Sequence, residues 1–284
     1  MFELTVVSGK GGTGKSSIVR ALLDCAQTCV IADCDVDASN LHLVLEHSIR
    51  DTEPFISGHE YRIDQALCTQ CGLCVRRCAY NAIDGFVIDQ YACEGCGVCH
   101  YFCPSGAVEK SARNCGNLFQ AQSEYGPFVY ARLNPGEENS GKLVSKVRER
   151  GKECGKEYRH ELMINDGPPG IGCSVIASLT GASAVLIVTE PTISGLHDYQ
   201  RVRELAGHFS LPVIVCVNRA DINPELTERF RNGCGQDGTV FAGTVDYSGS
   251  FDEAQRRKTS VMHTGPETVR SQILSVWSAL QQYL

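Results

Sequence analysis

Residues 9–16 read GKGGTGKS, and this stretch decides the fold. It follows an apolar run, LTVVS at 4–8, and it precedes a helical pattern from about Lys15 to Ala26. The pattern G-x-x-x-x-G-K-[ST] between a strand and a helix is typical of a phosphate-binding loop, in which backbone amides and the helix N-terminus surround the phosphates. A glycine-rich turn without a ligand is the alternative. The flanking strand and helix favour nucleotide binding.

The residues of this loop have separate expected roles. Lys15 is expected to pair with the β- and γ-phosphates, and Ser16 to hold Mg²⁺ through its hydroxyl. The residues expected to surround the nucleotide are Gly9, Lys10, Gly11, Gly12, Thr13, Gly14, Lys15, Ser16 and Ser17.

Further apolar runs follow at 162–166, 184–190, 212–218 and 239–245. Near-continuous apolar strands with helical stretches between them belong to a parallel sheet that is covered on both faces. We therefore expect an α/β fold with a doubly wound, mostly parallel sheet. The other expected elements are a strand at 29–33, short and long helices at 40–46 and 141–150, a hairpin within 118–133 and a closing helix at 266–284.

Sixteen cysteines are a high number, and eight of them form two C-x2-C-x2-C-x3-C runs. This is the bacterial two-cluster ferredoxin spacing, in which the fourth Cys of each run ligates the other cluster. Zinc is the main alternative, although two tandem runs of four do not match paired C-x2-C zinc knuckles. The expected ligands are Cys68, Cys71, Cys74 and Cys103 for one 4Fe–4S cluster, and Cys93, Cys96, Cys99 and Cys78 for the other.

The segment that contains these runs differs from the rest of the chain. From about 58 to 110 it is dense in Cys and Gly and has two similar halves, which indicates an internal repeat. The α/β pattern resumes afterwards. We expect a small α+β ferredoxin-like insert at 58–110 within a discontinuous P-loop ATPase domain formed by 1–57 and 111–284.

A second lysine, Lys10, makes the phosphate loop more specific. KGGTGKS resembles the deviant Walker A motif of the MinD/ParA and nitrogenase iron protein superfamily, where this lysine reaches the partner's phosphates in an ATP-sandwiched dimer. A solvated lysine is the alternative. DCDVDASN at 33–40 resembles the family's switch I, D-x-D-x-x-x-x-N. The resemblance implies that Asp35 orients the attacking water and that Asp33 lies near magnesium.

Two further segments resemble the same family. DGPPG at 166–170 is similar to its Walker B and switch II segment, which implies that Asp166 holds Mg²⁺ through water and that Gly167 contacts the γ-phosphate. Asn218 resembles the family's adenine-contacting Asn. The sequence N-R-x-D that begins there departs from the guanine signature N-K-x-D, so ATP is favoured over GTP. The implied catalytic residues are Lys10, Lys15, Asp35 and Asp166.

Nearly the whole chain resembles MinD-superfamily ATPases with an inserted ferredoxin domain. The resemblance implies ATP, Mg²⁺ and two 4Fe–4S clusters, and an ATP-dependent homodimer or heterodimer with a paralogue. The ATP cycle would be coupled to electron transfer to a redox or iron–sulfur acceptor protein. An iron–sulfur assembly or transfer ATPase and a MinD-like spatial organiser are alternatives. Cys173 is placed similarly to a cluster ligand of the nitrogenase iron protein, and a packed thiol is its alternative.

Composition bounds the partners and the compartment. The formal net charge of −7 argues against nucleic acid, which requires a basic footprint. No run of 18 or more apolar residues exists, and the N-terminus lacks the features of a signal peptide. The C-terminal stretch favours a core-packing helix over a membrane-targeting one. Because iron–sulfur ligand spacing suits a reducing compartment, we expect a cytoplasmic protein.

Overall fold

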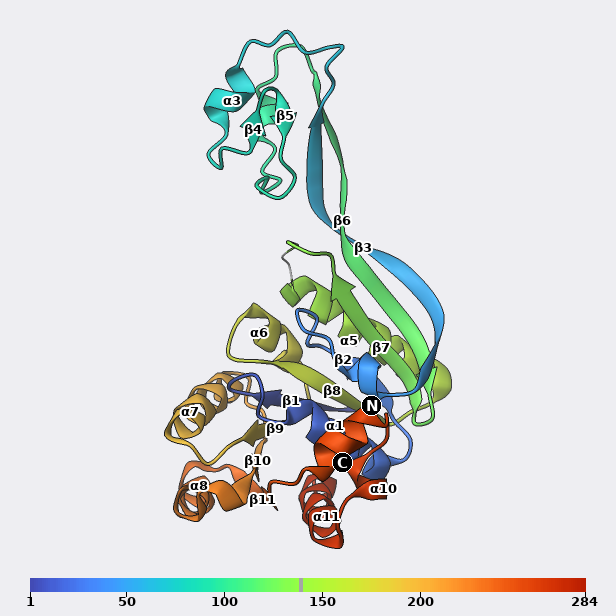
Figure 1. Cartoon of the computed structure of the whole chain (residues 1–284), viewed down its shortest axis with the longest axis vertical. Coiled ribbons are helices and arrows are strands. Elements are labelled where there is room, and N and C mark those ends of the chain that lie inside the picture. Colours follow the sequence, from blue (N-terminus) through green and yellow to red (C-terminus); the bar gives the residue numbers. More distant parts are fainter. Residues whose placement is uncertain (138–139) are drawn as a thin grey trace. The chain divides into compact units, whose positions relative to one another are not determined.

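The computed structural model describes residues 1–137 and 140–284, apart from the side chains of residues 236 and 237. Contacts between residues divide the chain into two units, drawn in Figure 1. We call them the sheet unit and the cysteine unit. The sheet unit comprises Met1–Glu53, Leu118–Arg132 and Ser140–Leu284, and the cysteine unit comprises Pro54–Asn117 together with residues 133–137.

The main sheet has nine strands in the order β11-β10-β9-β1-β8-β2-β7-β6-β3. The strands from β11 to β7 pair in parallel. The expected mostly parallel α/β fold of a P-loop NTPase is therefore confirmed. The strands are β1 (Phe2–Ser8), β2 (Val30–Asp33), β3 (His47–Ile63), β6 (Val108–Ser123), β7 (Gly126–Leu133), β8 (Leu162–Pro169), β9 (Ala184–Thr189), β10 (Val213–Asn218) and β11 (Val240–Val245).

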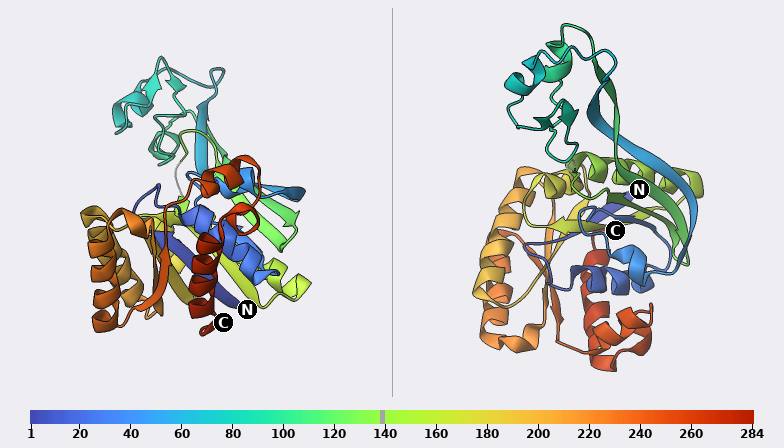
Figure 2. Two further views of the ribbon diagram at one scale, coloured as in Figure 1. Left: turned by 60° about the horizontal axis from the view of Figure 1, so that its bottom comes forward. Right: turned by 45° about the horizontal axis from the view of Figure 1, so that its top comes forward.

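Helices cover both faces of this sheet, as the views in Figure 2 show. Val6 and Leu186 belong to the core on one face, with α1 and α11. Their neighbours Val7 and Ile187 belong to the core on the other face, with α6, α7 and α8. Because both faces are covered, adjacent residues are both apolar. The helices of this unit are α1 (Lys15–Ala26), α2 (Leu41–Val44), α5 (Ser140–Tyr158), α6 (Cys173–Leu179), α7 (Ile193–His208), the 3₁₀ turn η1 (Ala220–Ile222), α8 (Pro224–Asp237), α9 (Ser250–Arg256), α10 (Val261–Thr264) and α11 (Glu267–Gln281).

Helix α5 is longer than the sequence predicted. The expected helix ended at 150, before two glycines, yet α5 continues to Tyr158. The glycines allow close packing: an added Cβ would lie 2.8 Å from Met163 Sδ at Gly151 and 2.3 Å from Met1 Sδ at Gly155. These glycines therefore bring the helix against the sheet and do not end it.

The strands β3 and β6 are the largest difference from the sequence analysis. The expected insert boundaries at 58 and 110 fall inside them. β3 contains Pro54 and Gly58, and most of its side chains are at least partly exposed, so no apolar run marks it. It is the last strand in the sheet order, and an edge strand tolerates proline because one side of its backbone needs no partner.

The cysteine unit contains short elements: α3 (Leu73–Arg77), α4 (Val98–Tyr101) and an antiparallel pair, β4 (Ile83–Asp84) and β5 (Val87–Ile88). Each helix follows a left-handed glycine, at φ 73° before α3 and φ 79° before α4. One hydrophobic cluster of the unit has cysteine side chains packed against it, and its buried residues are Tyr61, Ile83, Ile88 and Val108. Among all described residues, no helix combines the length and apolarity needed to cross a membrane.

Candidate functional site

The phosphate loop lies between β1 and α1, and the side chain of Asn218 at the end of β10 contacts it. The Nδ2 of Asn218 donates a hydrogen bond to the carbonyl oxygen of Thr13 over 2.8 Å. Gly14 has a φ of 83°, and an added Cβ there would lie 2.3 Å from the same Nδ2. Only glycine fits this position. The adenine contact expected for Asn218 stays a prediction, and this bond leaves the second amide hydrogen and Oδ1 of Asn218 for it.

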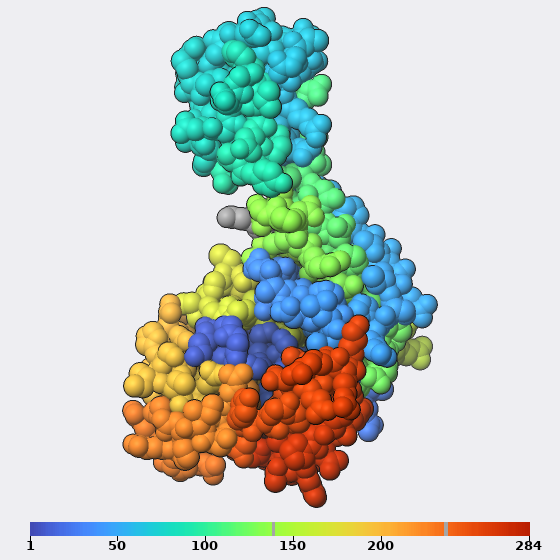
Figure 3. Space-filling model, in the orientation of Figure 1, coloured from blue at the N-terminus to red at the C-terminus, as the bar shows by residue number. Residues whose placement is uncertain are grey.

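The loop itself faces solvent. Gly11 and Gly12 are exposed, and Figure 3 shows the dark-blue N-terminal residues at the surface of this unit. Thr13 is buried, and its Oγ1 has no hydrogen-bond partner among the described residues. Ser17 Oγ accepts a hydrogen bond from Gln255 Nε2 over 3.2 Å. An open loop of backbone amides with an unpartnered hydroxyl is suited to an anionic ligand.

Lys15 is buried among carboxylates. Its Nζ lies 2.5 Å from Asp166 Oδ1 and 3.9 Å from Asp35 Oδ2. Burial opposes the charge of this ammonium group, but Asp166, Asp35 and Asp33 outweigh it and raise the pKa of Lys15. The lysine therefore stays protonated and available to a phosphate.

Asp33 lies at the end of β2, opposite Asp166 of β8 in the parallel register. It is fully buried, and its carboxylate accepts hydrogen bonds from Ser39 Oγ at 2.7 Å and from the amides of Asp35 and Leu41, both at 3.2 Å. Burial and the neighbouring charge of Asp166 raise the pKa of Asp33. Such a carboxylate is held in place by its hydrogen bonds, and the charge of Lys15 only partly offsets the effects of burial and of Asp166.

Magnesium suits this group of side chains. Three carboxylates, of Asp33, Asp35 and Asp166, surround one ammonium group, which leaves negative charge in excess. Mg²⁺ commonly takes one or two carboxylates, with water and substrate phosphate completing its shell. Ser16, the other expected ligand, is half-buried at the start of α1.

Gly167 follows Asp166 where β8 passes beside β1. An added Cβ would lie 2.7 Å from the carbonyl oxygen of Val6 and 2.8 Å from Val7 Cγ1. The amide of Gly170 donates to the carbonyl oxygen of Ser8 over 2.8 Å. The expected switch II segment is therefore attached to the strand that leads into the phosphate loop.

Lys10 contacts residues that the sequence analysis did not identify. Its Nζ lies 3.3 Å from Glu190 Oε2 and 3.4 Å from Ser194 Oγ, and its side chain is 39% exposed. Glu190 also forms an ion pair with Arg219. Glu190 ends the apolar run at 184–190, and a charge in that position was the signal that could have identified it.

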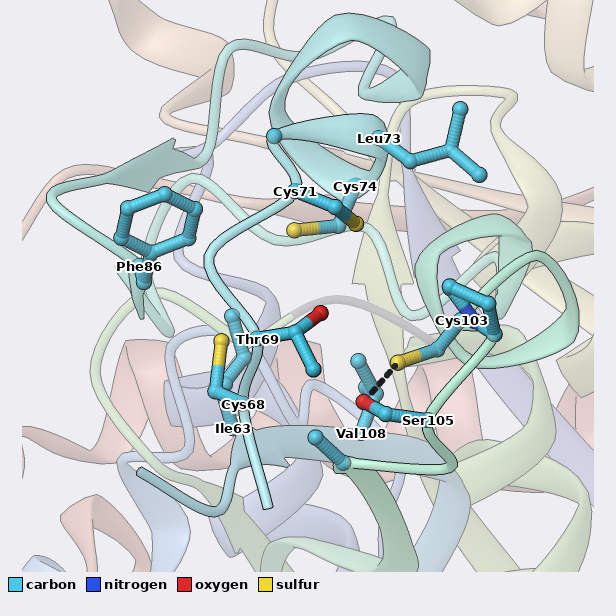
Figure 4. A pocket seen from close by; sticks show the side chains of 13 residues that line it. Ile63, Cys68, Thr69, Cys71, Leu73, Cys74, Phe86, Cys103, Ser105 and Val108 are labelled. Atoms are coloured by element: carbon cyan, nitrogen blue, oxygen red, sulfur yellow. Dashed lines mark hydrogen bonds between the residues drawn. The ribbon is translucent and has the colours of Figure 1, made fainter. Parts of the chain in front are cut away.

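Two hollows in the cysteine unit collect the eight cysteines of the two runs. The first is shown in Figure 4, where the four labelled sulfur atoms face a common space. The cysteines that line it are Cys68, Cys71, Cys74 and Cys103. The second is lined by Cys78, Cys93, Cys96 and Cys99. Each hollow thus combines three cysteines of one run with the last cysteine of the other.

The two hollows are alike in size and in the contacts of the exchanged cysteine. Each has about 310 Å³ of space not filled by atoms, part of it open to solvent. Cys103 Sγ lies 3.7 Å from Ser105 Oγ, and Cys78 Sγ accepts a hydrogen bond from the amide of Ala82 over 3.3 Å. No three His, Cys, Asp or Glu side chains among the described residues are grouped closely enough to hold one metal ion.

Of the eight remaining cysteines six are buried, Cys25 is half-buried and Cys173 is exposed, and none of the sixteen forms a disulfide. Cys29 and Cys216 are buried, and burial raises the pKa of each to about 12, so they are unreactive packing residues. Cys173 is exposed as the first residue of α6, next to Gly141 of α5. Its ligand or redox role stays a prediction.

The nucleotide-binding part of the chain matches a known family. The profile of the CobQ/CobB/MinD/ParA nucleotide binding domain matches residues 4–261. An uncharacterized protein of Methanocaldococcus jannaschii, MJ0578, is 33% identical over 226 residues, which cover 78% of this chain and 80% of that protein.

Solved structures show the same fold. The cell division ATPase MinD of Pyrococcus furiosus aligns with a TM-score of 0.60 and 15% identity over 100% of both chains. The septum site-determining protein MinD of Pyrococcus horikoshii, complexed with Mg-ADP, aligns with a TM-score of 0.58 and 15% identity over 99% of this chain and 97% of its own. At 15% identity these two structures establish the fold of the chain, and they do not bear on a ferredoxin subfamily.

The match to the family profile extends over most of the chain and includes the phosphate loop, Asp33, Asp166 and Asn218. The parallel sheet agrees with that match, and so does the placement of these residues near the carboxyl ends of its strands and beside them. The chain therefore belongs to the CobQ/CobB/MinD/ParA nucleotide-binding domain family.

Proposed function

We propose that this protein is a Mg²⁺-dependent ATPase that acts as a nucleotide-controlled switch, and that its cysteine unit carries two 4Fe–4S clusters. The observation that supports the ATPase is the group of three carboxylates around the buried Lys15 of the phosphate loop. Phosphoryl transfer requires positioned charge rather than covalent chemistry by the protein. This group supplies that charge near the carboxyl ends of the central strands.

In the proposed reaction, Lys15 exchanges its carboxylate partner for the β- and γ-phosphates of ATP. Asp166 is then free to act on Mg²⁺ through water, together with Ser16. The bound Mg²⁺ would neutralise charge that develops on the phosphate oxygens. Asp35, whose side chain is 16% exposed, is accessible to solvent and orients the attacking water.

ATP binding would also bring two copies together. Lys10 is partly exposed, and its present partner Glu190 is shared with Arg219. Glu190 is buried, but its ion pair with Arg219 stays when Lys10 leaves, so the carboxylate is not left without a cation. We propose that Lys10 reaches the phosphates of a second copy or of a paralogue. The exposed side chain of Ile193, beside Ser194, would be covered in such a dimer.

The eight cysteines fit a pair of 4Fe–4S clusters. The ligand sets would be Cys68, Cys71, Cys74 and Cys103, and Cys78, Cys93, Cys96 and Cys99, which are the two sets that line the hollows. A single zinc ion needs four sulfurs within about 2.3 Å of one point. In a four-iron cluster each cysteine binds a different iron, so the four sulfurs stand further apart. The lack of a single-ion group is therefore compatible with clusters.

Two roles for the switch remain open, and they differ in what the cysteine unit does. As an electron carrier, the protein would exchange electrons with an acceptor in one nucleotide state; bound clusters supply one-electron chemistry. As a MinD-like organiser, which the comparisons favour, it would use the same ATP cycle to control its position or its partners. A cluster-assembly role fits less well, because a set of eight ligands retains its clusters.

The test combines metal analysis with a redox titration of anaerobically purified protein. We expect about eight irons and eight acid-labile sulfides per chain, because each cluster contains four of each. The titration is run without nucleotide, with ADP and with a non-hydrolysable ATP analogue. A potential that changes with the ATP analogue supports the carrier. Unchanged potentials together with full ATPase activity leave the organiser, and zinc in place of iron excludes the clusters.

A further inference from the structure

One short segment joins two elements of the sheet unit but belongs to the cysteine unit. Residues 133–137 begin with Leu133, the last residue of β7, and precede α5; both β7 and α5 are elements of the main α/β fold. Their contacts nevertheless group them with Pro54–Asn117. We call residues 133–137 the tether.

The tether is bonded to β6. The amide of Asn134 donates to the carbonyl oxygen of Cys115 over 2.8 Å, and its side-chain Nδ2 donates to the carbonyl oxygen of Asn114, also over 2.8 Å. The amide of Glu137 donates a hydrogen bond to the carbonyl oxygen of Asn134 over 3.0 Å, and this bond closes a turn. These bonds fix the position of the Glu137 carboxylate relative to β6.

Arg113 of β6 connects this carboxylate to the second cysteine run. Its Nε donates to Glu137 Oε1 over 2.9 Å, its Nη1 to the carbonyl oxygen of Cys93 over 3.0 Å, and its Nη2 to that of Gln90 over 3.5 Å. The side chains of Arg113 and Glu137 are only 19% and 13% exposed. Charge-assisted bonds in partly buried places are stronger than surface ion pairs. One guanidinium therefore links the tether to the loop that begins the second run.

A polar cavity lies at this link. It has about 860 Å³ of space, part of it open to solvent, compared with about 310 Å³ for each cysteine-lined hollow. Residues from the tether and from the second run line it together, namely Gly136 and Glu137, Tyr91, Cys93, Glu94 and Gly95, with Arg113 and residues 57–59. The first hollow shares none of the tether residues. The second cysteine site thus borders a solvent-accessible cavity that the tether also lines, whereas no tether residue lines the first hollow.

Both ends of the tether continue into elements of the nucleotide site. β7 pairs with β2, with Tyr130 opposite Asp33. α5 packs against α6, where a Cβ on Gly141 would lie 3.4 Å from the carbonyl oxygen of Cys173. α6 directly follows the segment that begins at Asp166. A movement of the Asp33 segment on ATP binding therefore reaches the tether through β7, whose last residue is Leu133.

We infer that the tether and Arg113 transmit the nucleotide state to the second cysteine site and not to the first, by changing solvent access to the cavity beside Cys93. The inference rests on the proposed function for the identity of what the second site holds. Solvent exposure and hydrogen bonding are the protein's means of adjusting an iron–sulfur site. The two cysteine sites thus have the same kinds of ligand, but only the second responds to the nucleotide state.

The experiment is hydrogen exchange on the full, anaerobically purified protein, with and without a non-hydrolysable ATP analogue. We expect the exchange rates of amides at 90–95 to change by about fivefold or more on binding, in the range of ordinary coupling, while those at 68–74 stay constant. In Glu137→Gln, which replaces a charged acceptor by a neutral one, the change at 90–95 is reduced or lost. Arg113→Lys, which removes the guanidinium that bonds to Glu137, Cys93 and Gln90 together, should give the same result.

The matched control is Glu60→Gln. It makes the same chemical change on β3, where Glu60 Oε1 accepts a 3.2 Å hydrogen bond from Ser111 Oγ and is not bonded to the tether. It should retain the wild-type response. Iron content and binding of the analogue are measured on the same samples. Full iron and bound analogue without a response at 90–95, or with an equal response at 68–74, overturns the inference alone, whereas a protein without iron or without binding overturns the proposed function with it.

Discussion

The sheet unit and the cysteine unit are stabilised in different ways. The sheet unit buries apolar side chains on both faces of a parallel sheet, and its helices contribute to each core. The cysteine unit has a cluster of four buried hydrophobic residues, and the side chains packed against them include five of its cysteines. Small folds that cannot bury enough apolar surface depend on metals or cross-links. On the proposed function, we therefore expect the sheet unit to fold through its apolar burial, and the cysteine unit to depend on the groups that its cysteines bind.

Removing iron gives the largest expected effect and tests this contrast directly. After anaerobic chelation, the cysteine unit should lose its ordered structure, because binding of a structural metal group contributes directly to the free energy of folding. The sheet unit should keep its fold and its affinity for ATP. Limited proteolysis of the treated protein measures the order of both units, since cleavage should concentrate within 54–117. Equal resistance of the two units without iron would contradict the contrast.

Lys15→Ala should abolish tight nucleotide binding while the cysteine unit keeps its iron. It removes the cation that faces the phosphates and leaves three carboxylates without compensation. We expect ATP affinity to fall by roughly 100-fold or more, since the charge is buried and strongly coupled. Isothermal titration calorimetry measures the affinity. Lys10→Ala is the matched control, and it should still bind ATP but fail to dimerise; unchanged ATP affinity in Lys15→Ala would remove the assignment of the phosphate site.

The same substitution in the two cores should have different consequences. Ile273→Ala, in the sheet unit, removes a fully buried side chain of α11 and should lower the free energy of unfolding by about 2–5 kcal/mol without loss of iron. Ile88→Ala, in the cysteine unit, removes a side chain that is 7% exposed and packs among the cysteines. It should reduce iron retention instead. Denaturant unfolding and iron analysis of both variants separate these outcomes, and equal iron loss would show that the units are not independent.

The smallest expected effect is that of Asn218→Ala. The substitution removes the hydrogen bond to the Thr13 carbonyl oxygen that supports the phosphate loop. A hydrogen bond of this kind contributes about 1 kcal/mol, so ATP affinity should fall by roughly fivefold and iron content should not change. A much larger loss with retained stability would show that Asn218 contacts the nucleotide directly. Competition between ATP and GTP in the same variant would then reveal whether it reads the base.

Periodic features of the sequence predicted the sheet unit well. The bounds of α1 match the expected 15–26 closely, because the loop motif fixes where that helix begins. The carboxylates at the strand ends could be placed because parallel strands end at a common edge. β3 could not be predicted, since a mostly polar edge strand has no apolar face to mark it. Glu190 as the partner of Lys10, and the tether, arise from contacts between distant segments, which no local pattern encodes.

The exchange of the last cysteine between the two hollows has a consequence for how the protein is made. Cys103 lines the hollow formed by the first run, and Cys78 lines that of the second. During synthesis, the first hollow therefore stays open while the next 25 residues after Cys78 emerge from the ribosome. Neither half of the repeat is a complete product by itself. The second set is complete at Cys99 and the first only at Cys103, four residues later, so the two sites should become complete almost together and late in this segment.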